Sequence, residues 1–342
     1  MSTKRGYSWL VKYIVNRLMQ IIICFMLIQV IIFLLPRVIP GNPIETLMAR
    51  LIETGMTNPE ALKDVEKMLL EYFKFDKPLH VQFIDYMSNL LRGDLGKSVM
   101  FFPKSVNEVI LSYLPWTLAL MIPAIIASWI IGNVLGVFIG MKSSKRSINA
   151  MSVFLMGLSA IPPYILGFFL IYIFAVYWKL LPVGGGWDPS MRPSLTLSFI
   201  IDYIRHYTLP FVTLIIPMIS GWAIGMRGIA IREAASYSTN YLRIVGVKDR
   251  LIFRYLFRAS MAPQMYSLAI AIGWSITGSV IMEIVFNYPG LGSVFLTALR
   301  NQDYMLIQGF YTIISLTILL AIFITDIAIA ILDPRIRHGF VG

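Results

Sequence analysis

The sequence is poor in charged residues for its length. Only 14% of its 342 residues are Asp, Glu, Lys or Arg, whereas 57% are hydrophobic. A soluble globular domain carries about 25% charged residues. The composition therefore argues against a soluble domain and predicts an integral membrane protein.

Cysteine and histidine are scarce as well. The single cysteine, Cys24, lies in an apolar run, which leaves no disulfide framework and no cysteine-based metal site. The three histidines, His80, His206 and His338, are too far apart for the spacing of metal ligands. The sequence also offers no recognisable pair of a nucleophile and a base. We therefore expect neither a metal site nor a catalytic residue in this chain.

A phosphate-binding loop is only partly represented. Residues 93–98, GDLGKS, end like such a loop, but the motif requires glycine at position 91, which is Leu91. We therefore expect that this chain does not hydrolyse ATP itself and binds no cofactor of its own.

Long apolar runs dominate what the sequence does contain. Each of six runs is long enough to cross about 30 Å of hydrocarbon as a helix. The runs are Ile14–Leu35, Leu114–Met141, Ala150–Tyr177, Thr208–Met226, Met265–Phe286 and Gln308–Leu332. The polar segment 37–113 between the first two runs is expected outside the membrane. The predicted fold class is an all-α integral membrane protein with six transmembrane helices.

The basic residues set the predicted orientation. With both termini in the cytoplasm, Lys and Arg concentrate in the short inner loops, as the positive-inside rule requires. The strongest concentration is Met226–Gln264, where seven basic residues accompany two acidic ones. This loop is either a structure to which another protein binds or an ordinary loop that only fixes the membrane topology. Because the basic residues divide by membrane side, the net charge of +11 does not indicate nucleic acid.

Glycine and proline interrupt two of the apolar runs. Gly132, Gly136 and Gly140 recur every four residues, which gives a helix a flat face for close packing against another helix. Pro162 and Pro163 interrupt the third run, and we expect a kink there, because the freed backbone groups must find other partners.

Two acidic residues lie at or inside the boundary of an apolar run. Glu283 near the outer end of the fifth run either lines a pathway or proton relay, or is a headgroup-level acid paired with a cation. Asp326, near the inner end of the sixth run, has the same two interpretations.

Five short motifs follow one another along the chain. They are Pro40-Gly41-Asn42-Pro43, Leu91–Ser98 (LRGDLGKS), Leu114–Leu118 (LPWTL), Glu283–Gly292 (EIVFNYPGLG) and Leu332–Arg337 (LDPRIR). Each is weak alone, but in this order and between these runs they resemble the motifs of permease subunits of dipeptide/oligopeptide-class ABC importers. The resemblance extends over nearly the whole chain.

The resemblance implies a short cytoplasmic coupling helix that docks on an ATPase, marked in such permeases by E-A-A-x3-G. The literal Glu233-Ala234-Ala235 lacks glycine at that spacing and is expected to end the fourth span. With Gly246 as the motif glycine, Asn240, Tyr241 and Leu242 occupy the E-A-A positions. The coupling helix is then expected within Ser236–Val247. The expected ATPase-coupling residues are Asn240, Tyr241, Leu242, Arg243, Gly246, Asp249 and Arg250.

The resemblance also implies the type I ABC importer permease fold and a division of the chain. Residues 1–36 hold the N-terminal cytoplasmic segment and first helix, and 37–113 form the extracytoplasmic segment. Residues 114–335 form the five-helix core with a coupling loop at 227–262, and 336–342 form the tail. The expected pathway or gating residues are Glu283, Pro162, Pro163, Gly132 and Gly136. Asp333, Pro334 and Arg335 are expected to mark the cytoplasmic end.

The implied activity is ATP-driven import through the cytoplasmic membrane of a prokaryote. The implied partners are a second homologous permease, two ABC ATPase subunits that bind ATP and Mg, and an extracytoplasmic substrate-binding protein. Peptides are the expected cargo, with oligosaccharides or nickel as the alternative. A secondary transporter is less favoured because the sequence shows no inverted repeat. A membrane-embedded enzyme and a non-transporting scaffold are further alternatives.

Overall fold

The computed structural model describes residues 2–38, 43–53, 55, 58–73, 77–143, 145–275 and 280–332. Within these ranges the chain is helical, and the only β-type pairing is an isolated bridge between Lys97 and Ser105. The predicted all-α class is therefore confirmed. The helices are α1 Ser2–Val38, α2 Pro43–Glu53, α3 Pro59–Phe73, α4 Leu79–Leu91, α5 Val106–Met141, α6 Arg146–Ala160, α7 Pro163–Leu170, the π-helix η1 Ile171–Tyr177, α8 Leu197–Ala234, α9 Tyr237–Ile244, α10 Asp249–Ala259, α11 Met261–Gly273, α13 Val280–Val285, α14 Leu291–Arg300 and α15 Tyr304–Leu332.

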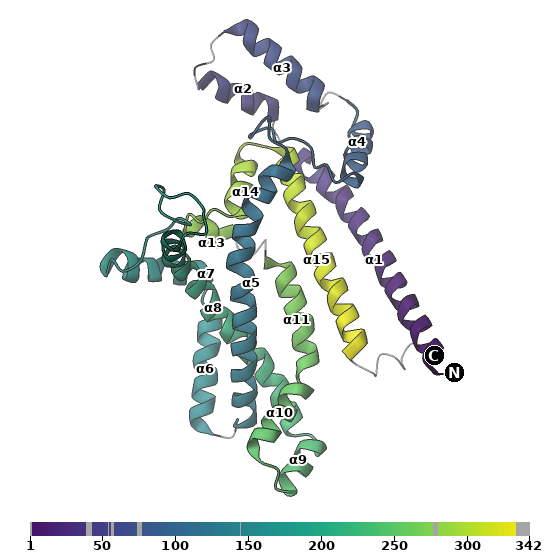
Figure 1. Ribbon diagram of the computed structural model, residues 1–342, viewed down its shortest axis with the longest axis vertical. Coiled ribbons are helices and arrows are strands. Elements are labelled where there is room, and N and C mark those ends of the chain that lie inside the picture. The colour runs from purple at the N-terminus through teal and green to yellow at the C-terminus, as the bar shows by residue number, and fades with distance from the viewer. Residues whose placement is uncertain are drawn as a thin grey trace.

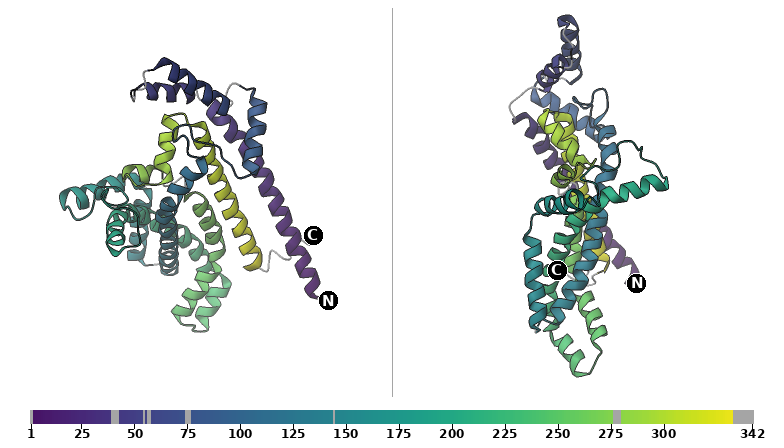
Figure 2. Two further views of the ribbon diagram at one scale, coloured as in Figure 1. Left: turned by 45° about the horizontal axis from the view of Figure 1, so that its top comes forward. Right: turned by 90° about the vertical axis from the view of Figure 1, so that its left-hand side faces the viewer.

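The helices form an elongated bundle with different structures at its two ends (Figure 1). Helices α2 and α3 lie beyond one end, with α4 beside α1 near that end, and α9 and α10 lie at the other end (Figures 1 and 2). The start of α1, the end of α15 and the turn between α5 and α6 all point toward the end that holds α9 and α10. These are the segments that the charge pattern groups on one side of a membrane.

The helices that can span a membrane follow the apolar runs. Four are long and apolar enough within the described part of the chain: Lys12–Arg37 of α1, α5, α8 and Tyr304–Ile327 of α15. A fifth span is possible as α6 followed by α7 and η1, which are bent by 90° at their junction. The bend coincides with Pro162 and Pro163, so the predicted kink is confirmed. The fifth predicted run is divided between α11 and α13, and the count of six spans stays a prediction.

Two helices begin well before the apolar runs that predict them. Helix α5 starts at Val106, because Ser105 caps it by accepting the Glu108 backbone N–H at 3.1 Å. The Ser-x-x-Glu spacing is a capping-box sequence. Helix α8 starts at Leu197, well before the apolar run Thr208–Met226 that predicts it.

An aromatic ladder accounts for the early start of α8. Phe199, Tyr203, Tyr207 and Phe211 recur every four residues, with neighbouring ring centroids 6.3, 5.7 and 5.2 Å apart. Side chains at this spacing lie on one face of a helix and contact one another. The ladder extends α8 beyond its apolar part.

The C-terminal part of α1 is attached to α4 and α15 by buried polar groups. Gln29, fully buried, accepts hydrogen bonds from Tyr86 at 2.7 Å and from Thr312 at 2.9 Å through its side-chain oxygen. Arg37 donates to the side-chain oxygen of Gln82 at 2.9 Å. These contacts, with that between Tyr86 and Thr312, attach α4 to two long helices.

The glycine face of α5 packs directly on α8. A Cβ atom at Gly132 would lie 2.4 Å from the Trp222 Cβ, and one at Gly136 would lie 2.5 Å from the Ala223 carbonyl oxygen. At Gly140 it would lie 2.7 Å from the Ala230 Cβ. Only glycine allows this approach, so the predicted close helix packing is confirmed.

We expect Gly136→Ala and Gly157→Ala to change stability in opposite directions. The new methyl at position 136 would overlap the α8 backbone, and overpacking of this kind costs about 1–3 kcal/mol. At Gly157 on α6 a Cβ meets nothing within 4 Å among the described residues. There the higher helix propensity of alanine stabilises by up to about 1 kcal/mol. Thermal unfolding of the purified proteins in one detergent measures both effects, and equal shifts for the two variants would contradict the packing argument.

Candidate functional site

A fully buried carboxylate joins three helices near one end of the bundle. Glu283 on α13 is 0% exposed. Its Oε1 accepts the hydroxyl of Thr117 at 2.7 Å, and its Oε2 accepts the Gly292 backbone N–H at 2.6 Å. The Thr117 oxygen also accepts the Leu291 backbone N–H at 2.8 Å. We call Thr117, Glu283, Leu291 and Gly292 the Glu283 clamp.

The clamp brings two of the predicted motifs into contact. Thr117 belongs to LPWTL (114–118) in the N-terminal part of α5, and the other three residues belong to EIVFNYPGLG (283–292). A Cβ atom at Gly290 would lie 2.1 Å from the Glu283 carboxyl carbon, and one at Gly292 would lie 2.4 Å from the Val280 Cα. Both glycines of the Pro-Gly-Leu-Gly sequence are therefore required, because a side chain at Gly290 would displace the Glu283 carboxylate and one at Gly292 would displace α13.

The three consecutive glycines at 184–186 pack on the same segment. The Gly185 N–H donates to the Phe286 carbonyl at 2.7 Å. A Cβ atom would lie 2.4 Å from the Phe286 carbonyl oxygen at Gly184, and 2.7 Å from the Pro289 Cδ at Gly186. The loop between η1 and α8 is thus closely apposed to the 283–292 segment.

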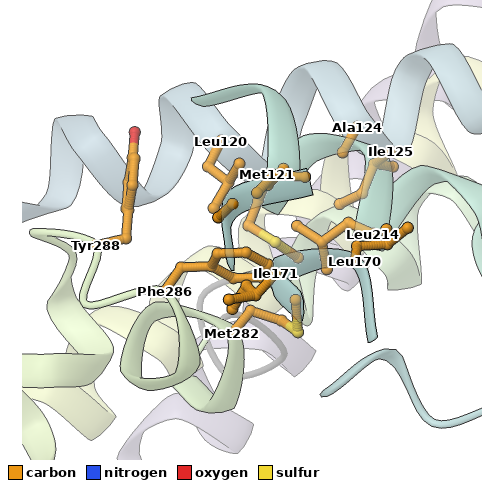
Figure 3. Packing of buried hydrophobic residues seen from close by; sticks show 12 residues of the cluster. Leu120, Met121, Ala124, Ile125, Leu170, Ile171, Leu214, Met282, Phe286 and Tyr288 are labelled. Carbon is orange, nitrogen blue, oxygen red and sulfur yellow. The ribbon is translucent and has the colours of Figure 1, made fainter. Parts of the chain in front are cut away.

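Aromatic residues of this segment fix it to the surrounding helices. The Phe286 ring is buried in the apolar cluster that includes Met121 of α5 and Ile171 of η1 (Figure 3). The Tyr288 hydroxyl lies 2.9 Å from the Tyr203 hydroxyl of α8. The segment therefore contacts α5, η1 and α8 as well as α14.

The predicted pathway residues occupy three separate places. Glu283 lies in the clamp, where hydroxyl and backbone donors satisfy its carboxylate. Pro162 and Pro163 lie at the bend between α6 and α7, and Gly132 and Gly136 lie against α8. The structure does not bring these residues together in one site. Their roles in a pathway or in gating stay predictions.

A second buried carboxylate, Asp303, was missed by the sequence analysis. It is 0% exposed and accepts hydrogen bonds from the Ser98 hydroxyl and from the Met100 backbone N–H at 3.0 Å. It also caps α15 by accepting the Leu306 N–H at 3.1 Å. Burial raises the pKa of Asp303 above its ordinary value, while the hydrogen bond from Ser98 lowers it. The sequence signal that could have indicated Asp303 is an aspartate directly before an apolar run, a common helix N-cap position.

The LRGDLGKS motif ends at this carboxylate. Gly93 and Gly96 adopt φ of +75° and +81°, in the left-handed region that favours glycine. The Asp94 carboxylate accepts the Gly96 N–H at 2.8 Å and closes the turn. Ser98 then reaches Asp303, so the motif forms a tight turn that anchors the 93–105 segment to α15. The helix that follows begins only at Val106, which is not the strand–loop–helix arrangement of a phosphate-binding loop.

The predicted coupling segment contains a short helix with both ends capped. Ser236 caps the start of α9 by accepting the Thr239 N–H at 3.3 Å. At the other end Gly246 has φ of +79°, its N–H donates to Arg243, and the Val247 N–H donates to Leu242. This hydrogen-bond pair is a Schellman motif, which explains why glycine stands at 246. The expectation of a helix within Ser236–Val247 is confirmed, as is the position of Glu233 at the end of α8.

The surface of α9 is unusually apolar. Four of its exposed residues are apolar or aromatic: Tyr237, Tyr241, Ile244 and Val245, with exposed fractions of 97%, 66%, 84% and 60%. Of the predicted coupling residues, Leu242 is half-buried, whereas Asn240, Tyr241, Arg243, Gly246, Asp249 and Arg250 are exposed. Tyr237, Ile244 and Val245 were not among the predicted residues.

Helix α10 connects this surface to the bundle. Ile252 and Leu256 of α10 are buried against Val137 of α5 and Met226 of α8. Leu242 of α9 packs on the same cluster. Helices α9 and α10 therefore pack on α5 and α8 through one apolar cluster.

Two predicted segments cannot be compared with the fold. Asp333, Pro334 and Arg335 lie outside the described residues, as do Pro40, Gly41 and Asn42 of the first motif.

Comparison with known proteins identifies the class. Residues 132–338 match the family described as binding-protein-dependent transport system inner membrane component. Residues 10–121 match the N-terminal part of such membrane components. Together with the apolar helices, these matches define a multi-pass membrane permease of an ABC transport system. The chain belongs to the binding-protein-dependent transport system inner membrane component family.

Curated relatives match this chain over nearly their full length. The chain is 30% identical, over 95% of its length and 99% of the relative, to a probable peptide ABC transporter permease protein of Sinorhizobium fredii. It is 28% identical, over 96% of its length and all of the relative, to the oligopeptide transport system permease protein OppB of Haemophilus influenzae. The glutathione transport system permease protein GsiC of Shigella flexneri is 28% identical over the same shares. The resemblance to peptide-class ABC importer permeases is confirmed.

We expect Thr117→Val to destabilise the protein through the Glu283 clamp. The substitution keeps the volume of the side chain but leaves the Glu283 carboxylate and the Leu291 N–H each short of one partner. A buried polar group without its partner costs about 1–3 kcal/mol. Thermal unfolding in detergent measures the loss.

Thr213→Val is the matched control. Thr213 is as buried as Thr117, but its hydroxyl donates only to the Leu209 carbonyl within α8. Thr117→Ser keeps the hydroxyl and should remain close to the unsubstituted protein. A Thr117→Val protein no less stable than Thr213→Val would show that the clamp contributes little.

Proposed function

We propose that this chain is one of the two permeases of an ATP-driven importer that carries peptides across the cytoplasmic membrane. Relatives of nearly identical length that are named for peptides, oligopeptides and glutathione support this cargo. They favour peptides over the oligosaccharides or nickel that the motifs alone left open. A second homologous permease completes the translocation pathway, and an extracytoplasmic binding protein delivers the substrate.

The proposed topology has six spans with both termini in the cytoplasm. The third span is α6 with α7 and η1, and the fifth is α11 with α13. Residues 1–36 hold the first span, 37–113 form the extracytoplasmic segment, 114–335 form the core, and 336–342 form the tail. The position of α9 and α10 at the same end as the start of α1 and the end of α15 supports this orientation.

ATP hydrolysis acts on this chain through the coupling loop 227–262. Two partner ATPase subunits bind ATP and Mg, and this chain binds neither. The exposed apolar face of α9 docks on an ATPase, with Tyr241 at its centre and Asn240, Leu242, Arg243, Gly246, Asp249 and Arg250 around it. Buried apolar surface supplies most of the free energy of such contacts, and the exposed fractions of Tyr241 and Ile244 support this use.

The remaining predicted residues have supporting roles in this proposal. The bend at Pro162 and Pro163 is a hinge beside the pathway. Gly132 and Gly136 hold α5 and α8 together as one moving wall. Glu283 acts on transport by fixing the outer ends of these helices through the clamp. Asp333, Pro334 and Arg335 end the last span at the cytoplasmic face.

We expect cysteine labelling to place α3 outside and α9 inside the cell. In a Cys24→Ser background, which removes the single native cysteine, Lys63→Cys on α3 should react with a membrane-impermeant maleimide in intact cells. Tyr237→Cys on α9, in cells that produce the permeases without the ATPase subunits that would cover α9, should react only after permeabilisation. Both positions are exposed, so access across the membrane decides the result. Labelling of Tyr237→Cys in intact cells would reverse the proposed orientation.

We expect the assembled importer to take up peptides in proteoliposomes only with ATP, and Tyr241→Asp to abolish this uptake. A charge in an apolar docking face loses the contact and adds a desolvation cost of several kcal/mol. The measurements are uptake of an isotope-labelled casein digest and ATP hydrolysis by the same preparation.

Tyr241→Phe, which keeps the ring, should behave like the unsubstituted protein. Uptake that continues after ATP depletion but stops with a proton uncoupler would instead indicate a secondary transporter. Full coupling in Tyr241→Asp would remove α9 from the docking surface.

A further inference from the structure

Helix α8 carries three glycines that make no contact with α5. Gly221, Gly225 and Gly228 are exposed on one face of it. A Cβ atom at Gly221 or Gly228 would meet nothing within 4 Å among the described residues. This contrasts with the overlaps at Gly132 and Gly136. Small residues in a membrane helix also serve helix packing, so the stripe alone does not define a site.

A cavity lies along this face, between α8 and α11. Its volume is about 410 Å³, and its lining residues are Met218, Gly221, Trp222, Gly225, Gln264 and Ser267. Cavities of roughly 300–1,000 Å³ are typical of small-ligand sites. None of the lining residues is charged, so the cavity complements a neutral polar group rather than a free carboxylate or ammonium.

Gln264 is the polar group that points to a ligand. It is only 5% exposed, yet its side-chain amide makes no hydrogen bond with the described residues. The amide lies over the glycine stripe, with its Nε2 3.5 Å from where a Cβ of Gly225 would be. Neither of its amide atoms is among the fully buried polar atoms of the described residues that lack a partner, so both are accessible from the cavity. A ligand with both a donor and an acceptor can therefore bind to this amide.

The backbone beneath Gln264 is held in place by α5. The indole N–H of Trp129 donates to the Gln264 carbonyl oxygen at 3.1 Å. This bond fixes the first turn of α11 against α5. The side chain is therefore presented to the cavity by an anchored backbone, which lowers the entropy lost when a ligand binds.

We propose that this cavity contacts the transported peptide, and that the Gln264 amide pairs with a peptide bond of the substrate. A glutamine amide offers a carbonyl acceptor and N–H donors, which match the N–H and C=O of a peptide unit. The bare backbone at Gly221 and Gly225 leaves room for side chains of any size, so the contact does not depend on the peptide's sequence. This proposal rests on the peptide import proposed above.

The cavity lies at the inner ends of two predicted spans. Gly225 is one residue from the end of the fourth apolar run, Thr208–Met226, and Gln264 directly precedes the fifth, Met265–Phe286. In the orientation proposed above, this is the cytoplasmic end of the pathway, where the transported peptide leaves it.

The first test uses Gln264→Leu, Gly225→Leu and the control Gly157→Leu in the assembled importer. Gln264→Leu should lower uptake of an isotope-labelled casein digest about three- to tenfold, the value of one or two hydrogen bonds. Gly225→Leu fills the cavity and should lower it at least as much. Gly157→Leu adds the same side chain at an open position on α6 and should leave uptake unchanged. All variants must purify with the same content of ATPase subunits.

The second test probes the cavity directly. In the Cys24→Ser background, Ser267→Cys should react with a water-soluble thiol reagent in the assembled importer. Peptide digest supplied during ATP turnover should slow this reaction. No reaction at all would mean that a neighbouring helix covers the face, and it would overturn the proposal.

The outcomes separate this inference from the proposed function. If the unsubstituted importer carries peptides and both Gln264→Leu and Gly225→Leu carry them equally well, only this inference fails. If the unsubstituted importer carries no peptide, the proposed function fails, and the inference fails with it.

Discussion

The arrangement of the helices depends on how one buried carboxylate is satisfied. An ionised group inside a protein is tolerated only when hydrogen-bond donors replace its hydration. Glu283 obtains two of its donors from the Thr117 hydroxyl of α5 and the Gly292 backbone N–H of α14. The need for these donors fixes the 283–292 segment on α5. The glycines at 184–186 and the aromatic ladder of α8 then pack around the fixed segment.

Helix α5 links this clamp to the opposite end of the molecule. It holds Thr117 near one end, the glycine face against α8 in its second half, and Val137 against α10. Trp129 ties it to the first turn of α11 between these points. The clamp, the cavity beside Gln264 and the coupling loop are thus attached to one continuous helix rather than to separate domains.

Features encoded locally were predictable from the sequence, and those that depend on distant partners were not. The apolar runs, the bend at Pro162, the helix ending at Gly246 and the glycine face of α5 all follow from local pattern or backbone restriction. The motifs around Thr117 and Glu283 were also recognised, but nothing in either motif indicates that they touch. The Ser98–Asp303 contact and the open cavity beside Gln264 join residues far apart in the chain, and neither periodicity nor composition carries that information. The capping box at Ser105 was a readable signal that was overlooked.

The continuity of α5 has a mechanical consequence. Its 36 residues form a rod about 54 Å long at 1.5 Å per residue. When a stiff rod pivots near its middle, its ends travel in opposite directions. In the import cycle proposed above, a push on the coupling loop that draws one end of α5 inward would therefore swing its other end outward, so that one mouth of the pathway widens as the other narrows. A pivoting helix of this kind would need no separate gate to keep the two mouths from opening at the same time.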